Sequence, residues 1–218
     1  MGDACRALDT PVTGGNVSFH NESQNHAVYP TPTIGMLGII DDLNLTMSMN
    51  FKNEGDEIFL IGNNREELGG SEYVKHYAGK VSGLAPDIDM DEEIRLQKAI
   101  LALIQSKTIN SAHDISEGGL AICLAEKAIS SDNLGCLIQI DALNVGKLFG
   151  ESQSRVVVSC SPAKFGELVN TCSNFNVPVQ KIGDVQKEIF EIENYIKTDI
   201  NSIKIKYNNA IADIMKEK

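Results

Sequence analysis

Residues 111–128 have the sequence SAHDISEGGLAICLAEKA, and this segment decides the fold class. Residues 111–115 are predicted to form a short strand. After Gly118 and Gly119, apolar residues recur at the spacing of a helix that buries one face. These residues are Leu120, Ala121, Leu124, Ala125 and Ala128. A strand that passes directly into a buried helix predicts a domain in which helices pack on a sheet.

Strands and helices continue to alternate on both sides of this segment. The clearest helix is expected at residues 89–107, because Asp89 and Glu92 form a D-x-x-E variant of the capping box and an apolar face follows. Further strands are expected at residues 34–40, 56–61, 137–140, 155–160 and 177–182. Further helices are expected at residues 71–77 and 207–215. A short helix is expected to end at Gly150, and another is expected to start after the N-cap Ser161 and Pro162. Since turns join several of the strands, we predict an α+β (mixed α/β) domain whose mixed sheet is covered by helices.

The first 32 residues have a different character. Residues 10–19 suggest a strand interrupted by two glycines, and residues 21–32 are polar and turn-rich, which is typical of a linker. We expect residues 1–32 to be the end of a preceding domain plus this linker, and residues 33–218 to form one domain. A strand with no partner before it indicates a truncated piece of a longer protein.

Composition limits the possible functions. The 218 residues include 19 Lys and Arg against 30 Asp and Glu, a formal net charge of −11. Nonspecific nucleic-acid binding needs clustered cations and is not expected. The longest apolar run, residues 99–104, is far shorter than the roughly 20 residues that span a bilayer. Five cysteines without a C-x-x-C pair suggest free thiols in a reducing cytosol, with neither a disulfide framework nor a zinc site.

Two glycine-containing segments are candidate binding sites. In Gly14-Gly15-Asn16-Val17-Ser18, the glycines would let backbone amides approach phosphate oxygens, and the Asn16 carbonyl suits Mg²⁺. The alternative is a glycine bulge in a strand. In residues 114–119, helix N–H groups that follow a strand would form a cradle for a phosphate or a carbonyl. The alternative there is tight strand–helix packing that glycine permits.

A third candidate lies between a predicted helix and a predicted strand. Residues 148–155 include Glu151, Ser152, Gln153 and Arg155, and this mixture of donors and acceptors suits a polar small-molecule site. The alternative is a polar connection with Arg155 paired on the surface.

The order of four motifs carries a resemblance to a known family. The motifs are PVTGGNVSFHNE at residues 11–22, PTPTIGMLG at 30–38, LGGSEY at 68–73 and SAHDISEGGLA at 111–121. From about residue 11 to about residue 161, the sequence resembles the C-terminal part of the phosphoribosylformylglycinamidine synthase family, in its small-type synthetase subunit. The resemblance implies a C-terminal domain of the aminoimidazole ribonucleotide synthetase-like superfamily, preceded by a strand from the preceding domain.

The resemblance also implies a reaction, cofactors and partners. In this family of de novo purine biosynthesis, ATP with Mg²⁺ phosphorylates the formamide oxygen of formylglycinamide ribonucleotide. Ammonia from a glutaminase partner then displaces phosphate to give the amidine. Gly15 would contact ATP, Asn16 would bind Mg²⁺ and Ser18 would contact the ribonucleotide. Further implied partners are a small bridging subunit and the missing N-terminal domains of the same chain, in the cytoplasm.

The catalytic histidines and acidic Mg²⁺ ligands of the family belong to those N-terminal domains. We therefore expect no catalytic residue in this piece, and no activity of the piece alone. An auxiliary site is implied at the pseudo-symmetric counterpart of the substrate site, where it would hold an auxiliary nucleotide or nothing. It would comprise Asp114, Glu117, Gly118, Gly119, Glu151, Ser152 and Gln153.

Two alternative functions stay open. One is another ATP-dependent enzyme of the superfamily, such as aminoimidazole ribonucleotide synthetase or selenophosphate synthetase, although residues 16–18 and 30–32 argue against it. The other is a noncatalytic scaffold domain.

Overall fold

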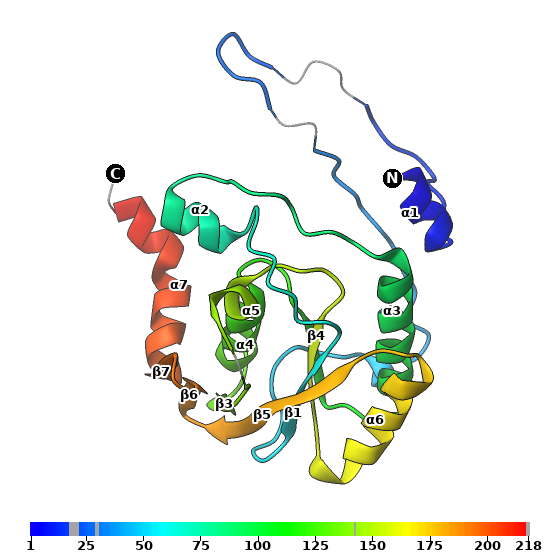
Figure 1. Cartoon of the computed structure of the whole chain (residues 1–218), viewed down its shortest axis with the longest axis vertical. Coiled ribbons are helices and arrows are strands. Elements are labelled where there is room, and N and C mark those ends of the chain that lie inside the picture. Colours follow the sequence, from blue (N-terminus) through cyan, green and yellow to red (C-terminus); the bar gives the residue numbers. More distant parts are fainter. Residues whose placement is uncertain (18–21, 29–30, 142, 217–218) are drawn as a thin grey trace. The chain divides into compact units, whose positions relative to one another are not determined.

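The computed structural model describes residues 1–17, 22–28, 31–141 and 143–216. The chain divides into two units, Met1–Asn44 and Leu45–Lys218. The first unit contains helix α1 (Gly2–Ala7) and an isolated β-bridge between Glu22 and Ala27. The second unit contains the sheet and the helices that cover it (Figure 1). The domain boundary at residue 32 stays a prediction.

Seven strands form one mixed sheet in the second unit, in the order β2-β4-β1-β5-β3-β6-β7. Every neighbouring pair is antiparallel except β3 and β6, which run parallel. The strands are β1 (Glu57–Ile61), β2 (Ser111–Asp114), β3 (Leu134–Ile138), β4 (Val156–Cys160), β5 (Val179–Lys187), β6 (Ile189–Ile192) and β7 (Ile196–Asp199). The predicted α+β fold with a mixed sheet is confirmed.

The central strand β1 shows why both faces of the sheet are covered. Ile58 and Leu60 belong to one hydrophobic cluster, and Phe59 and Ile61 belong to another. Since successive side chains of a strand point to opposite faces, each face of the sheet has its own core. Helices α4 (Gly119–Ile129) and α5 (Val145–Phe149) supply the first core, and α3 (Met90–Gln105) and α6 (Phe165–Asn174) the second (Figure 1).

Helices α2 and α3 begin where the sequence predicts. The Asp89 carboxylate accepts hydrogen bonds from the N–H groups of Asp91 and Glu92, at 2.9 and 3.0 Å, and so caps α3. The reciprocal half of the capping box is absent here, because the Glu92 carboxylate instead accepts hydrogen bonds from Arg65 and Asn63. The short helix α2 (Glu72–Ala78) follows the predicted N-cap, Ser71, and ends at Gly79.

Two predicted strands are wrong. Residues 10–17 and residues 34–40 contain no strand, and residues 18 and 19 of the first one lie outside the described part of the chain. An extended apolar pattern becomes a strand only where a second strand supplies hydrogen-bond partners. Within the described residues, no strand pairs with either segment. The strand expected from a preceding domain is therefore not formed by residues 10–17.

The last forty or so residues are more regular than the sequence suggests. Strand β5 extends to Lys187, and β6 and β7 complete the edge of the sheet. Helix α7 (Ile200–Lys216) begins seven residues before its predicted start. The Asp199 carboxylate accepts a hydrogen bond from the Ser202 N–H at 2.9 Å, and Ile200 is buried. Capping and burial together therefore extend α7 toward its N-terminus.

Candidate functional site

A single carboxylate joins the starts of two helices. The Oε1 atom of Glu151 accepts hydrogen bonds from the backbone N–H of Gly118, at 2.7 Å, and of Glu72, at 2.8 Å. Gly118 is the N-cap of α4, and Glu72 is the first residue of α2. A negative charge at this position satisfies two otherwise free amides and favours both helix dipoles. An internal carboxylate therefore occupies the Gly118 amide of the predicted phosphate cradle, and the Gly119 amide donates to the carbonyl oxygen of Ser116 at 3.1 Å.

The two glycines of this junction are required by close packing. Gly118 and Gly119 have φ angles of +79° and +69°, in the left-handed region that favours glycine. A Cβ atom on Gly119 would lie 2.7 Å from the carbonyl oxygen of Gly150 and 2.8 Å from that of Leu148. The loop that carries Glu151 thus packs directly on the start of α4. Glycine thus permits tight packing here, as the predicted alternative supposed, but the neighbour of α4 is the end of α5 and not a strand.

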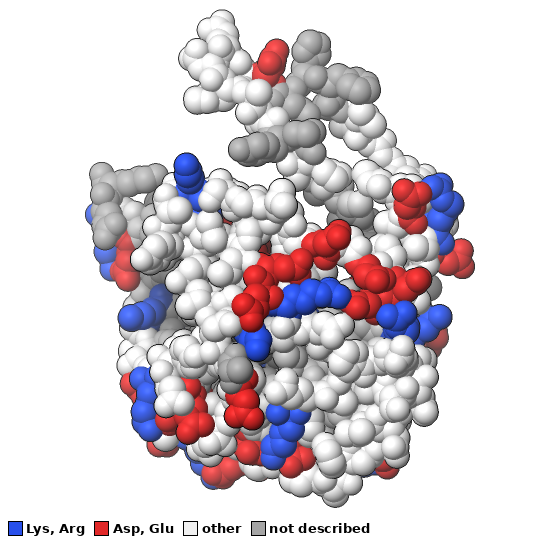
Figure 2. Space-filling view, in the orientation of Figure 1, with Lys and Arg blue, Asp and Glu red and all other residues white. Residues whose placement is uncertain are grey.

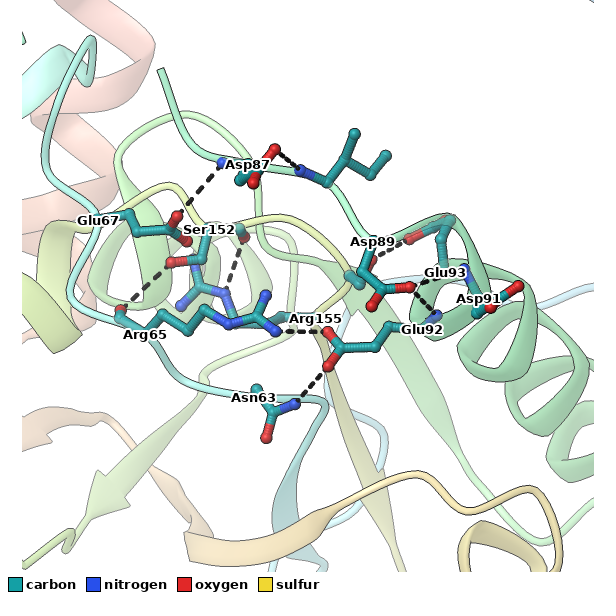
Figure 3. A network of polar contacts seen from close by, with 12 residues as sticks. Asn63, Arg65, Glu67, Asp87, Asp89, Asp91, Glu92, Glu93, Ser152 and Arg155 are labelled. Carbon is teal, nitrogen blue, oxygen red and sulfur yellow. Dashed lines mark hydrogen bonds and ion pairs between the residues drawn. The ribbon is translucent and has the colours of Figure 1, made fainter. Parts of the chain in front are cut away.

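Ser152 and Arg155 hold the same loop from inside. The buried Arg155 guanidinium donates hydrogen bonds to the carbonyl oxygens of Ser152, at 2.9 Å, and Gly150, at 2.8 Å, and to Asn64 Oδ1 at 2.7 Å. Burial lowers the pKa of Arg155 to about 10, so it remains charged at neutral pH. The buried Ser152 hydroxyl donates to the carbonyl oxygen of Arg65 at 3.3 Å (Figure 3). The sequence alternative placed Arg155 in a surface pair. The structure instead buries its side chain and pairs it with loop oxygens.

An acidic pocket lies beside this loop. It has a volume of about 310 Å³, and its lining includes Asp114, Glu117, Glu151 and Gln153 from the predicted auxiliary site, with Glu93 from α3. The hydrogen bond from Ser116 lowers the pKa of Asp114, which keeps that carboxylate charged. Figure 2 shows the wider setting, a band of acidic side chains across the middle of this face. Four carboxylates against one buried guanidinium make the pocket a poor match for a nucleotide phosphate.

The other predicted site residues lie in the first unit. Gly15 and Asn16 are exposed and outside regular structure, and Ser18 lies outside the described residues. A Cβ atom added to Gly14 or Gly15 would meet nothing within 4 Å. The backbone at these glycines is therefore open to the approach of a ligand.

No complete metal centre is found in the described part of the chain. No group of three or more His, Cys, Asp or Glu side chains there is placed to hold a metal ion.

The five cysteines are free, and four of them are buried, as the sequence predicts for a chain without a disulfide framework. Among the residues that the structure describes, no helix has both the length and the apolar character needed to cross a bilayer.

Sequence reasoning missed a buried cation on α4. The Lys127 ammonium donates hydrogen bonds to the Met49 carbonyl oxygen, at 2.8 Å, and to Ser111 Oγ, at 2.9 Å, and lies 5.0 Å from the centre of the Phe51 ring. Burial lowers the pKa of Lys127 to about 8. Its position four residues after Cys123, on the buried face of α4, is the signal that could have revealed it.

The comparison with protein families decides where this fold belongs. The sequence model of the family described as AIR synthase related protein, C-terminal domain, matches residues 53–192. The chain belongs to this family. The AIR synthase related domain accounts for six of the seven strands, from β1 to β6, and contains the Glu151 loop.

Curated relatives confirm the resemblance seen in the motifs. The chain is 44% identical over 191 residues to phosphoribosylformylglycinamidine synthase subunit PurL of Thermoanaerobacter sp. (strain X514) and of Thermoanaerobacter pseudethanolicus. The match covers 87% of this chain but only 26% of either relative. The chain thus spans about a quarter of the length of these proteins.

Solved structures share the fold of the AIR synthase related domain. T. maritima PurL complexed with FGAR has a TM-score of 0.64 and 17% identity, covering 74% of this chain and 30% of that one. T. maritima PurL complexed with ATP has a TM-score of 0.57, 17% identity and 28% coverage of its chain. PurLQS from Thermotoga maritima has a TM-score of 0.57, 16% identity and the same coverage. At these identities the likeness shows the fold alone.

Proposed function

We propose that this chain is the C-terminal part of a phosphoribosylformylglycinamidine synthase, a carbon–nitrogen ligase of de novo purine biosynthesis. The observation that carries this proposal is the 44% identity to PurL over 191 residues. Because the chain matches only 26% of that relative, the reaction belongs to the longer protein. The chain alone would then be inactive, since no residue of it is assigned to bond making or breaking.

The proposed substrates and partners are those of the whole enzyme. The substrates are ATP, formylglycinamide ribonucleotide and ammonia from a glutaminase subunit, with a small bridging subunit in a cytoplasmic complex. The solved T. maritima structures of PurL complexed with FGAR, of PurL complexed with ATP and of PurLQS support these assignments. ATP with Mg²⁺ would supply the phosphoryl group that activates the formamide oxygen for displacement by ammonia.

This chain's own contribution is proposed at residues 14–18. The open backbone at Gly15 would let its amide approach an ATP phosphate, and the exposed Asn16 would add one neutral oxygen ligand to Mg²⁺. Ser18 would contact the ribonucleotide. Since the described residues hold no cluster of metal ligands, the carboxylates that bind Mg²⁺ would come from the rest of the full-length enzyme.

A scaffold role is proposed for the auxiliary site. The Glu151 carboxylate occupies the amides of Gly118 and Glu72 that a phosphate would need, and the surrounding pocket is acidic. A nucleotide would have to displace an internal ion that two helix starts already stabilise. The auxiliary residues would therefore fix the loop, the starts of α2 and α4 and the edge of the sheet, without binding a nucleotide.

A chimeric enzyme tests the proposed function. The matching C-terminal quarter of the Thermoanaerobacter PurL would be replaced by this chain, and ATP- and ammonia-dependent amidine formation would be measured. We expect the chimera to retain activity and the isolated chain to show none. Calorimetry of the isolated chain with ATP and Mg²⁺ tests the scaffold role, for which we expect no binding at the Glu151 loop.

A further inference from the structure

A second pocket opens between α3 and α6, on the other face of the sheet from α4. Its volume is about 520 Å³, which lies within the range typical of small-molecule sites. One wall is apolar and includes Leu96, Val169, Val177 and Pro178. The pocket adjoins the acidic pocket at Leu96 and Ser154, but it contains none of the residues predicted for the auxiliary site.

The pocket contains one arginine, Arg95, for which no hydrogen bond or ion pair is recorded within the described residues. Arg95 lines the pocket, and its buried Nε atom has no hydrogen-bond partner within the described residues. The other two arginines nearby are fully engaged: Arg65 pairs with Glu92 at 2.7 Å, and Arg155 binds three oxygen atoms. A buried donor without an acceptor is rare in folded proteins, and a bound water, ion or ligand can supply the acceptor.

The carboxylates beside Arg95 are already satisfied by other groups. Glu92 accepts hydrogen bonds from Arg65, at 2.7 Å, and from Asn63, at 3.1 Å. Glu93 accepts hydrogen bonds from Ser154, at 2.6 Å, and from Gln97, at 2.7 Å. Both carboxylates are thus engaged by groups other than Arg95. Figure 3 shows this for Glu92, which accepts hydrogen bonds from Arg65 and Asn63.

The acidic side chains near Arg95 favour a singly charged anion over a doubly charged one. Asp89 interacts electrostatically with Arg95, and Asp91 lies in the same first turn of α3. This negative field opposes a doubly charged phosphate more strongly than a singly charged carboxylate. The planar guanidinium fork also matches the two oxygens of a carboxylate.

We propose that this pocket binds a small aliphatic monocarboxylate. Its carboxylate pairs with the Arg95 guanidinium, and its hydrocarbon body packs on Leu96, Val169 and Val177. The hydroxyl of Ser173 and the amide of Asn176 form the polar rim. This site is independent of the proposed ligase function, because it shares no residue with the segment assigned to ATP or with the residues predicted for the auxiliary site.

A titration of the isotope-labelled 218-residue chain followed by NMR tests the proposal. Isovalerate is the probe, isovaleramide is its neutral isostere, and inorganic phosphate is the alternative anion. We expect isovalerate to bind with a Kd of about millimolar order, shifting resonances of Leu96, Val169 and Val177. We expect isovaleramide to bind at least about tenfold more weakly than isovalerate. Inorganic phosphate is not expected to compete with isovalerate. Equal binding of the amide, or competition by phosphate, would overturn the proposal.

Three variants locate the bound carboxylate. Arg95→Met keeps an unbranched, flexible side chain but removes the guanidinium and its charge, and we expect it to abolish saturable binding. Lys98→Met is the matched control, since it removes one positive charge from the exposed face of the same helix and should bind as the parent does. Ser173→Trp should fill the pocket from the exposed rim without a change of charge, so it tests the site even if Arg95→Met fails to fold. Parent-like binding by a folded Arg95→Met or Ser173→Trp variant contradicts the proposal.

Discussion

The Glu151 Oε1 atom lies 2.7 Å from the backbone nitrogen of Gly118, at the start of α4. The same atom reaches the start of α2 at the Glu72 nitrogen, 2.8 Å away. A segment whose sequence suggests a ligand cradle is thus held by the protein's own carboxylate.

Removal of the Glu151 carboxylate should weaken both helix starts. We expect Glu151→Ala to lower the free energy of unfolding by about 1–2 kcal/mol, because two backbone donors lose a charged acceptor. Glu151→Gln, which keeps an acceptor oxygen, should cost less. Urea denaturation provides the measurement, and the exposed Gln153→Ala is the control, with a change below about 0.5 kcal/mol. An unchanged free energy of unfolding for Glu151→Ala would show that the contact does not stabilise the fold.

A side chain at Gly119 should be strongly destabilising. Its φ of +69° disfavours any L side chain, and the new Cβ would lie 2.7 Å from the Gly150 carbonyl oxygen. We expect Gly119→Ala to lower the free energy of unfolding by at least about 2 kcal/mol. Gly166→Ala on α6 is the matched control, since its Cβ meets nothing within 4 Å and should stabilise the helix by about 0.5–1 kcal/mol. Similar melting temperatures for the two variants would contradict this packing argument.

The buried Lys127 should make stability depend on pH. Its pKa falls from 10.5 to about 8 on folding, so the unfolded chain holds more protons between these two values. The free energy of unfolding therefore rises with pH across that window, and this gain is absent below about pH 8.

The effect of Lys127 is isolated by comparison with Lys127→Met. Burial also raises the pKa of Cys123 to about 12, which acts in the opposite direction as pH rises, but this thiol is present in both proteins. Between pH 7.5 and 10, we expect the parent to gain about 2 kcal/mol relative to Lys127→Met. Parallel pH profiles of the two proteins would mean that Lys127 titrates normally.

Most of the sheet domain could be predicted from local sequence signals. Ser71, Asp89 and the Gly118-Gly119 pair mark helix starts through capping and backbone conformation, which act over a few residues. The segments at residues 10–19 and 34–40 misled because strand formation depends on a neighbour that local pattern does not reveal.

The sequence identified the residues of the candidate site but not the contacts between them. The sequence singles out Glu151 and Gly118 separately, yet their hydrogen bond joins residues 33 positions apart. The burial of Arg155 and Lys127 was missed for a similar reason, since one acceptor of each, Asn64 for Arg155 and Met49 for Lys127, lies far along the chain. Such contacts depend on the tertiary fold rather than on local propensity.

Asn16 should matter for turnover but not for stability in the chimeric enzyme. Asn16→Ala removes one proposed Mg²⁺ ligand and leaves the carboxylates of the other domains. We expect turnover to fall by about 10²–10³-fold, the typical effect of losing one well-placed electrostatic contact. The melting temperature should stay the same, because Asn16 is exposed. Near-normal turnover would remove Asn16 from the site, and a large fall in melting temperature would mark it as structural.

Amidine formation by the chimera tests the assignment to the synthase most directly. The chimera, the parent Thermoanaerobacter PurL and the isolated 218-residue chain would be assayed together with ATP, Mg²⁺, ammonia and formylglycinamide ribonucleotide. The assignment predicts ATP-dependent turnover by the chimera and none by the isolated chain. A correctly folded chimera without turnover, beside an active parent, would contradict it.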